Sequence, residues 1–154
     1  MTLYEQNMQK IQELDVKCQY AAHQWMQECW QLNKQFRILE AFRTQKRQED
    51  LYAKGRTTSG NIVTWTKISM HTKRLAVDVE PIRCTLQQLE SIGREYGIYR
   101  PPDLVKLGDQ GHFQFDQAVG PPQISPTEAK RRLLRMINLE SDPQTRKRLL
   151  KRLI

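Results

Sequence analysis

The chain has three histidines among its 154 residues, and two of them stand close to acidic residues. His71 precedes Asp78 by seven positions, and His112 follows Asp109 by three. Two imidazoles and one carboxylate leave an open fourth position on a tetrahedral zinc ion, which is the ligand count of a catalytic site. Such an ion acidifies bound water and polarises a carbonyl, and a nearby second carboxylate such as Asp109 suits a general base. From spacing alone an alternative stays open, namely a solvated histidine beside an aspartate that caps or pairs.

The remaining histidine and the three cysteines are expected to have structural rather than catalytic roles. His23 lies inside a predicted helix, where a structural role is expected. Cys18 and Cys29 lie eleven positions apart on one face of the same helix, and a free cysteine there behaves as a small hydrophobic residue. With Cys84 they form an odd number without metal-ligand spacing, so no disulfide framework is predicted and a reducing compartment fits.

Short helices and strands must position these side chains. Apolar residues that recur every three or four positions predict helices, with Asp15, Thr44 and Thr85 as N-caps. Pro81 is expected to stop the strand before it. The pattern predicts an α+β fold, with helices packed on one face of a small, mostly antiparallel sheet. The predicted helices cover residues 15–33, 45–54 and 86–96, the predicted strands cover 36–42, 75–79 and 111–115, and 56–74 is mainly loop with a candidate short strand at 62–65.

Several separated motifs resemble those of the zinc peptidases that cut the peptides of bacterial cell walls. The family pattern Ser-x-His, six residues and Asp is matched by Ser69, His71 and Asp78. Its downstream pattern, an acid, two residues, a histidine and an aromatic residue, is also present. The resemblance runs from about residue 10 to 118. The other residues that match it in order are Arg43, Gln48, Leu51-Tyr52, Gly55-Arg56, Ile62-Val63-Thr64-Trp65, Asp109, His112 and Phe113.

This resemblance implies a complete catalytic zinc centre. By similarity to the family, His71, Asp78 and His112 bind Zn²⁺, and Asp109 is the catalytic base. Arg43 is implied to be catalytic and substrate-binding, because the family uses an arginine there to hold a carboxylate or the developing oxyanion. The alternative for Arg43 is a surface arginine at the end of a strand.

Gln48 and Ser69 are implied to line the substrate site. Support of the site without contact to substrate is the alternative reading of both residues. Tyr52 and Trp65 are compatible either with the core or with a wall of the substrate site.

Two positions depart from the family pattern. Arg74 stands where the family usually has glycine, three residues after the first histidine. Glycine there would permit an unusual backbone angle, so Arg74 is expected to take an ordinary conformation and to point toward the cleft, where it would add a cation. Gln114 stands where many members carry glutamate, and the sequence assigns it no role.

Charge divides the chain into three parts. The net charge is +8, and +6 of it lies in residues 127–154, which are predicted to form a basic tail of two helices. These helices are predicted to start at Ser125-Pro126 and Asp142-Pro143, where a capping residue precedes a first-turn proline. A Pro-rich linker is predicted over 119–126, and residues 1–118 are the predicted zinc peptidase domain. The tail is expected either to dock on this domain or to contact an anionic envelope surface. No apolar run is long enough for a membrane span.

The family contains D-alanyl-D-alanine carboxypeptidases and dipeptidases and phage L-alanyl-D-glutamate endopeptidases. The short chain without a visible signal peptide favours the phage-type endolysin, made in the cytoplasm and acting as a monomer on the stem peptides of peptidoglycan in the cell wall. A D-alanyl-D-alanine carboxypeptidase is the alternative within the family. From another class, the alternative is an inactive module that binds the envelope or nucleic acid through its tail. Nucleic acid is the less expected partner, because the chain shows no recognised DNA-reading motif.

Overall fold

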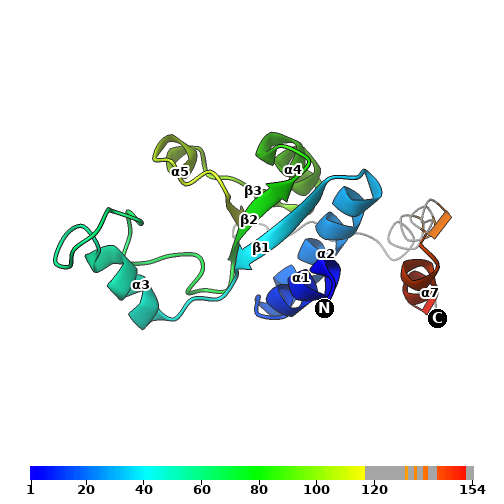
Figure 1. Ribbon diagram of the computed structural model, residues 1–154, viewed down its shortest axis with the longest axis horizontal. Helices are drawn as coiled ribbons and strands as arrows, with labels where there is room; N and C mark the ends of the chain where they lie inside the picture. Colours follow the sequence, from blue (N-terminus) through cyan, green and yellow to red (C-terminus); the bar gives the residue numbers. More distant parts are fainter. Residues whose placement is uncertain (117–130, 132–133, 135–136, 139–141, 152–154) are drawn as a thin grey trace.

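The computed structural model describes residues 1–116, 131, 134, 137–138 and 142–151. These residues form the predicted α+β fold, in which helices pack against a four-stranded antiparallel sheet (Figure 1). The predicted linker over 119–126 and the helix start at Ser125-Pro126 lie outside the described residues. In the tail, α7 (Pro143–Lys151) begins after Asp142, as the sequence predicts.

The sheet has the strand order β1, β2, β4, β3. Its register places Glu40 opposite Asp78, and Asp78 opposite His112. One row of paired residues across β1, β2 and β4 therefore carries Glu40, Asp78 and His112. The last two are among the three residues that the family resemblance implies as metal ligands. The strands are β1 (Gln35–Glu40), β2 (Ala76–Ile82), β3 (Ile98–Tyr99) and β4 (His112–Phe115).

The helices begin where the sequence places their caps. The side chains of Asp15, Thr44 and Thr85 each accept a hydrogen bond from a backbone N–H in the first turn of the helix that follows. These bonds satisfy N–H groups that have no partner inside the helix. The helices are α1 (Leu3–Ile11), α2 (Val16–Gln31), α3 (Gln45–Ala53), α4 (Leu86–Gly93) with the short 3₁₀ turn η1 (Arg94–Tyr96), and α5 (Pro102–Lys106).

Trp25 of α2 fixes the helices to the sheet. Its ring stacks on Phe36 of β1, with centroids 4.5 Å apart, and lies 5.0 Å from Phe113 of β4. Its indole N–H donates to the carbonyl of Leu89 in α4 at 2.9 Å. A buried tryptophan removes 150–250 Å² from water, which stabilises the fold by about 4–6 kcal/mol. This core lies directly behind β4, the strand that begins with His112.

The two cysteines of α2 pack as the sequence predicts. Cys18 and Cys29 are both fully buried in the core. Burial raises the pKa of the Cys18 thiol to about 11 and raises that of Cys29 further. Thiols with such a raised pKa stay protonated and unreactive near neutral pH. The ring of His23 is hydrogen-bonded to the Tyr4 hydroxyl of α1 at 2.7 Å, which is a structural role.

The predicted end of β2 is wrong, because the strand continues through Pro81 to Ile82. The N–H of Val79 donates to the carbonyl of Gly111, on the β4 side of β2. The nitrogen of Pro81, two residues further, faces the same side, where the pairing with β4 has already ended. No ladder bond is therefore lost at the proline.

The sequence analysis missed three elements and expected one that is absent. Helix α1 has local signals that were overlooked, the capping box of Thr2 and Glu5 and apolar residues at helical spacing, whereas β3 has two residues and α5 has five, too few for a periodic pattern. The candidate strand at 62–65 is not formed, and this segment is irregular. Long-range packing rather than local pattern decides the cases of β3, α5 and 62–65.

Asn7 of α1 closes the outer edge of β1. Its side-chain N–H donates to the carbonyl of Phe36 at 2.8 Å, and its Oδ1 accepts from the N–H of Ile38 at 2.9 Å. The side chain is fully buried. Asn7 thus takes the place of a neighbouring strand, which protects an edge that would otherwise offer unpaired backbone groups.

We expect Asn7→Ala to lower the free energy of unfolding by about 2–4 kcal/mol, because it leaves two buried backbone groups without partners. Chemical denaturation followed by circular dichroism measures this loss. Asn61→Ala, in the exposed loop after α3, is the matched control and should change stability by less than about 0.5 kcal/mol. Equal losses in the two variants would contradict the role of Asn7.

Candidate metal centre

A short turn before β2 presents His71. The hydroxyl of Ser69 accepts from the N–H of His71 at 3.2 Å, and the Thr72 hydroxyl donates to the carbonyl of Ser69 at 2.6 Å. Ser69 and His71 are both buried. The Ser69 hydroxyl therefore holds the backbone of the turn, while it also lies on the wall of the cleft described below.

The structure brings the side chains of His71, Asp78 and His112 together. One potential ligand atom from each residue lies within 4.8 Å of the other two. Oδ1 of Asp78 lies 3.0 Å from Nε2 of His71 and 3.4 Å from Nδ1 of His112. The two imidazole rings meet edge to face, with centroids 5.0 Å apart. These three atoms surround a common point, which is the arrangement that a metal ion requires.

The outer nitrogens of both rings have acceptors. Nδ1 of His71 lies 2.8 Å from the carbonyl oxygen of Ala41, and Nε2 of His112 lies 3.1 Å from Oε1 of Gln114. An acceptor on the far side of an imidazole keeps a proton there, so the inner nitrogen is the one that offers its lone pair when a metal displaces the hydrogen bond to Asp78. The donor set of two nitrogens and one carboxylate oxygen thus fits a metal of the zinc type.

Asp78 carries its negative charge between these rings. Burial opposes ionisation of Asp78, but hydrogen bonds and charge from His112 and His71 outweigh it, so the pKa of this carboxyl lies far below its usual range. The same pairing raises the pKa of His112, although burial of the ring acts in the opposite direction. A permanently charged carboxylate beside two imidazoles is the electrostatic condition for cation binding.

Asp109 lies at the rim of the same cleft, after α5. Its backbone N–H donates to the carbonyl of Leu104 at 2.9 Å, which fixes the turn that carries it. The residue is solvent-exposed, yet the cleft wall removes enough water to raise the pKa of its carboxyl, and the charge of Asp78 raises it further. A general base works best when its pKa lies near the working pH, and the raised pKa of Asp109 is a shift in that direction.

Arg43 faces the centre, but most of its guanidinium is already bonded within the protein. Its Nε and Nη2 donate to the two carboxylate oxygens of Glu40 at 3.1 and 2.6 Å, and its Nη1 donates to Oε1 of Gln48 at 2.6 Å. Nη2 also lies 3.5 Å from Oδ2 of Asp78. Of the five N–H groups, one on Nη1 is left for another partner.

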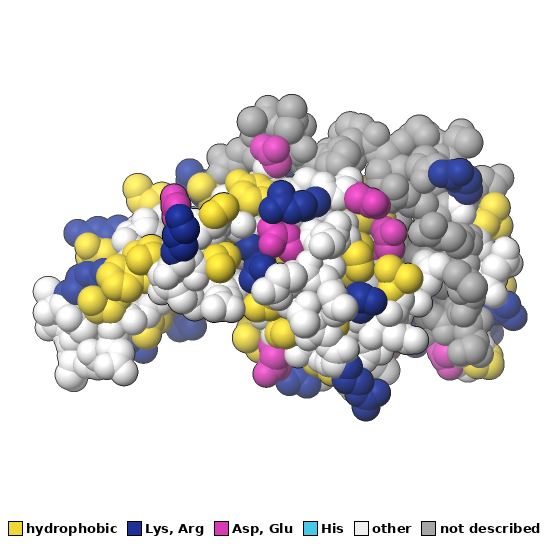
Figure 2. Space-filling model, turned by 90° about the horizontal axis from the view of Figure 1, so that it is seen from above, with side chains coloured by type: hydrophobic (Ala, Val, Ile, Leu, Met, Phe, Trp, Pro, Cys, Tyr) yellow, Lys and Arg dark blue, Asp and Glu magenta, His cyan; other side chains and the backbone are white. Residues whose placement is uncertain are grey.

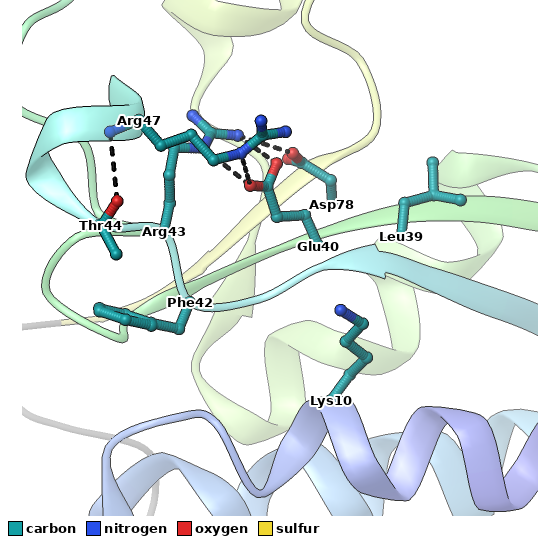
Figure 3. A pocket seen from close by; sticks show the side chains of 8 residues that line it. All are labelled: Lys10, Leu39, Glu40, Phe42, Arg43, Thr44, Arg47 and Asp78. Carbon is teal, nitrogen blue, oxygen red and sulfur yellow. Dashed lines mark hydrogen bonds and ion pairs between the residues drawn. The ribbon is translucent and has the colours of Figure 1, made fainter. Parts of the chain in front are cut away.

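Glu40 holds two arginines in place, and Figure 3 shows both guanidinium groups directed at its carboxylate. The Nε of Arg47 lies 3.0 Å from one oxygen of Glu40. Burial alone would raise the pKa of Glu40, but hydrogen bonds and charge from Arg43 and Arg47 lower it. Glu40 is a residue of the site that the sequence did not single out. Its position three residues before Arg43 is the signal that could have found it, and the sheet places it opposite Asp78.

Gln48 joins Arg43 to the loop that borders the cleft. The side chain is fully buried, and its Nε2 donates to the hydroxyl of Thr64 at 3.2 Å and to the carbonyl of Thr66 at 2.6 Å. Both ends of the amide are therefore used inside the protein. In the described structure, Gln48 supports the site and offers no free group to a substrate.

A cleft of about 440 Å³ opens over the three converging side chains. One wall is the loop after α3, where Ile62, Val63 and Trp65 are each at least two-fifths exposed. The opposite wall carries Leu104 and Leu107 from the α5 region. Figure 2 shows hydrophobic and basic side chains on the protruding end of the molecule that carries α3 in Figure 1.

Of the two aromatic residues whose place the sequence left open, Trp65 lines this cleft. Tyr52 lies in a neighbouring pocket of about 390 Å³, where the guanidinium of Arg56 stacks 3.8 Å from its ring centroid. A third pocket, of about 600 Å³, lies on the β1 side of Arg43 and reaches Asp78 from the other direction (Figure 3).

The predicted conformation and direction of Arg74 are wrong. Its φ is 63°, in the left-handed region, so the backbone takes the conformation that a glycine would take there. Its side chain points away from the cleft, with Nη1 donating to the carbonyl of Glu13 at 2.7 Å and the guanidinium 3.8 Å from the ring centroid of Phe42. Arg74 therefore adds no cation to the site and instead ties the His71 turn to the corner between α1 and α2.

These contacts offset the strain at Arg74. We expect Arg74→Ala to lower the free energy of unfolding by about 2 kcal/mol, because it loses a charged hydrogen bond and a cation–π contact and keeps the strained φ. Arg74→Gly loses the same contacts but relieves about 1 kcal/mol of strain, so it should be the more stable of the two variants. Thermal unfolding of both proteins measures the order, and an alanine variant at least as stable as the glycine variant would contradict it.

Comparison with known proteins gives one informative result. No family model and no curated protein sequence matches the chain. Among solved structures, the chain is similar to the vancomycin-resistance D,D-pentapeptidase VanY from a VanB-type resistance cassette, determined as a Glu-to-Ala variant in complex with Zn(II). The identity is 16% and the TM-score 0.51, with 66% of this chain and 72% of VanY covered. The chain therefore has the fold of a VanY-like zinc peptidase.

Proposed function

We propose that the protein is a zinc-dependent hydrolase of the peptides in bacterial peptidoglycan. The observation that carries this proposal is the convergence of His71, Asp78 and His112, each imidazole bonded on its far side, within a fold shared with a Zn(II)-binding peptidase. These three residues would hold the metal. When bound, Zn²⁺ would supply Lewis-acid polarisation of the scissile carbonyl and lower the pKa of water.

The residues around the metal would supply the general base and the stabilisation of the oxyanion. Asp109, with its raised pKa, would take a proton from the attacking water and return it to the leaving nitrogen. The N–H of Arg43 that remains on Nη1 would donate to the oxygen that gains negative charge. Glu40 and Gln48 would keep that guanidinium oriented.

The proposal favours cleavage within the stem peptide, at the bond between L-alanine and D-glutamate. A carboxypeptidase must capture a terminal carboxylate, for which a two-pronged arginine contact is the usual means. Arg43 is the one cation among the described residues that line the cleft, and Glu40 already occupies its fork. Release of D-alanine by carboxypeptidase action is the second candidate, since VanY is a D,D-pentapeptidase.

Mass spectrometry of purified peptidoglycan after digestion with the zinc-loaded protein tests both candidates. New L-alanine carboxyl ends are expected for the endopeptidase, whereas free D-alanine would establish the carboxypeptidase. Intact peptidoglycan with every divalent metal offered would refute hydrolysis and leave the alternative of a binding module.

We further propose that the basic tail, residues 127–154, binds the anionic surface of the bacterial envelope. The described cations of α7 are exposed, and Arg148 lies 3.9 Å from Glu5 of α1. No helix among the described residues is long and apolar enough to cross a membrane. Surface charge of this kind attracts anionic polymers and is weakened by salt.

We expect the double substitution Lys147→Glu and Lys151→Glu to reduce sedimentation of the protein with isolated cell envelopes severalfold at low salt. Turnover of soluble muropeptides should stay at the level of the unmodified protein, because neither residue lies near the cleft. Matched substitution of the exposed Lys46 and Lys54 in and after α3 is the control. Unchanged envelope binding would remove the tail from the proposal.

A further inference from the structure

Gln114 connects the candidate metal centre to the outer strand of the sheet. It stands two positions after His112 in β4, so both side chains project from the same face. Its Oε1 lies 3.1 Å from Nε2 of His112, and its Nε2 donates to the Tyr99 hydroxyl at 3.0 Å. Tyr99 lies opposite Gln114 in β3. A chain of two hydrogen bonds thus runs from the edge strand to the ring of His112.

The orientation of this amide decides which nitrogen of His112 can face a metal. An amide oxygen only accepts hydrogen bonds, so the ring nitrogen that faces it must carry the proton. The lone pair for a metal must then come from Nδ1, the nitrogen 3.4 Å from Oδ1 of Asp78, whose proton is released when a metal binds. The opposite amide orientation would present an NH₂ group to Nε2 and would move the ring proton to Nδ1, which closes that nitrogen to a metal.

The hydrogen-bond acceptors of His71 and His112 differ in whether a side-chain substitution can remove them. The acceptor for His71 is the backbone carbonyl of Ala41, which no side-chain substitution removes. The acceptor for His112 is the side chain of Gln114. His112 is therefore the ligand whose tautomer depends on another side chain.

We propose that Gln114, held in place by Tyr99, is a positioning residue that keeps His112 in the tautomer that binds the metal through Nδ1. The inference rests on the zinc binding proposed above. A carboxylate at position 114 would also accept from Nε2 and would raise the basicity of the ring. Gln114 therefore sets a weaker metal affinity than glutamate would set at the same position.

Competition with a chromophoric chelator measures the zinc affinity of the variants. Gln114→Met, which removes both hydrogen bonds at similar size, should weaken zinc binding by about 10–100-fold. Gln114→Glu should restore the affinity to at least that of the unmodified protein, and Tyr99→Phe should give a smaller loss than Gln114→Met. Gln87→Met, on the exposed surface of α4, is the matched control and should bind zinc normally.

Nitrogen-15 NMR of the zinc-loaded protein gives a second readout that is independent of activity. His112 should carry its proton on Nε2 and bind zinc through Nδ1. Zinc bound through Nε2 of His112, or a Gln114→Met variant with unchanged affinity, would overturn the inference while leaving the proposed function intact. An unmodified protein that takes up no zinc would overturn both.

Discussion

The Asp109→Asn variant should bind one zinc ion per chain and yet lose about 10²–10⁴-fold in the turnover of peptidoglycan peptides. Asparagine has nearly the same size as aspartate, so the turn held by the Leu104 carbonyl is preserved. The amide cannot take a proton from water, and this is the step that the raised pKa of Asp109 suits. Steady-state turnover of soluble muropeptides, measured together with zinc content, checks the expectation.

Asp103→Asn is the matched control for this prediction. Asp103 is exposed in the first turn of α5 and does not line the cleft. Its substitution should leave both zinc content and turnover unchanged. Normal turnover in Asp109→Asn would remove Asp109 as the base, and loss of zinc from this variant would instead make it a ligand.

The His71→Ala variant should lose zinc and activity together. His71 offers one of three converging ligand atoms, and removal of a direct ligand should weaken binding by more than the roughly 100-fold that loss of an outer hydrogen-bond partner can produce. Metal analysis after dialysis should find zinc near one per chain in the unmodified protein and near zero in the variant. Removal of zinc by a chelator should abolish the activity of the unmodified protein, and added zinc should restore it.

His23→Ala controls for the loss of a histidine elsewhere in the fold. His23 is hydrogen-bonded to Tyr4 of α1 and should not affect the zinc content. Circular dichroism checks that the variant is folded. Asp78→Asn provides a second test of the ligand set with almost no change in volume, and it should also lose zinc. Stoichiometric zinc in His71→Ala and in Asp78→Asn would refute the proposed centre.

Local signals made most of the fold predictable. The caps at Asp15, Thr44 and Thr85 depend on residues within three positions, and the apolar period of α2 is complete within its own sequence. The missed helix α1 has such a signal, the capping box of Thr2 and Glu5, whereas β3 and α5 are too short to show one. Strand β2 extends through Pro81 only because β4 has already ended beside it. Where the neighbouring strand determines the outcome, the sequence of one segment cannot predict it.

The residues of the candidate site likewise fall into those that the sequence indicates and those whose role depends on the fold. The spacing of His71, Asp78, His112 and Asp109 left an alternative open, the family resemblance implies all four, and the structure brings them to one cleft. Sequence spacing places Glu40 three residues before Arg43, but its position opposite Asp78 depends on the register of β1 against β2. The direction of Arg74 was likewise misjudged, since its partners on Glu13 and Phe42 lie far from it in the chain.

The sequence by itself determined which chemical groups the candidate centre can use, two imidazoles, a carboxylate and a nearby acid, because these groups are present or absent whatever the fold. Only the tertiary structure decided how each group is directed. It placed the carbonyl of Ala41, after β1, at Nδ1 of His71 and the amide oxygen of Gln114, on β4, at Nε2 of His112, and it occupied most of the Arg43 guanidinium with Glu40 and Gln48. The physical reason is that hydrogen bonds are directional and short, so they depend on the register of strands that the linear order of residues does not contain.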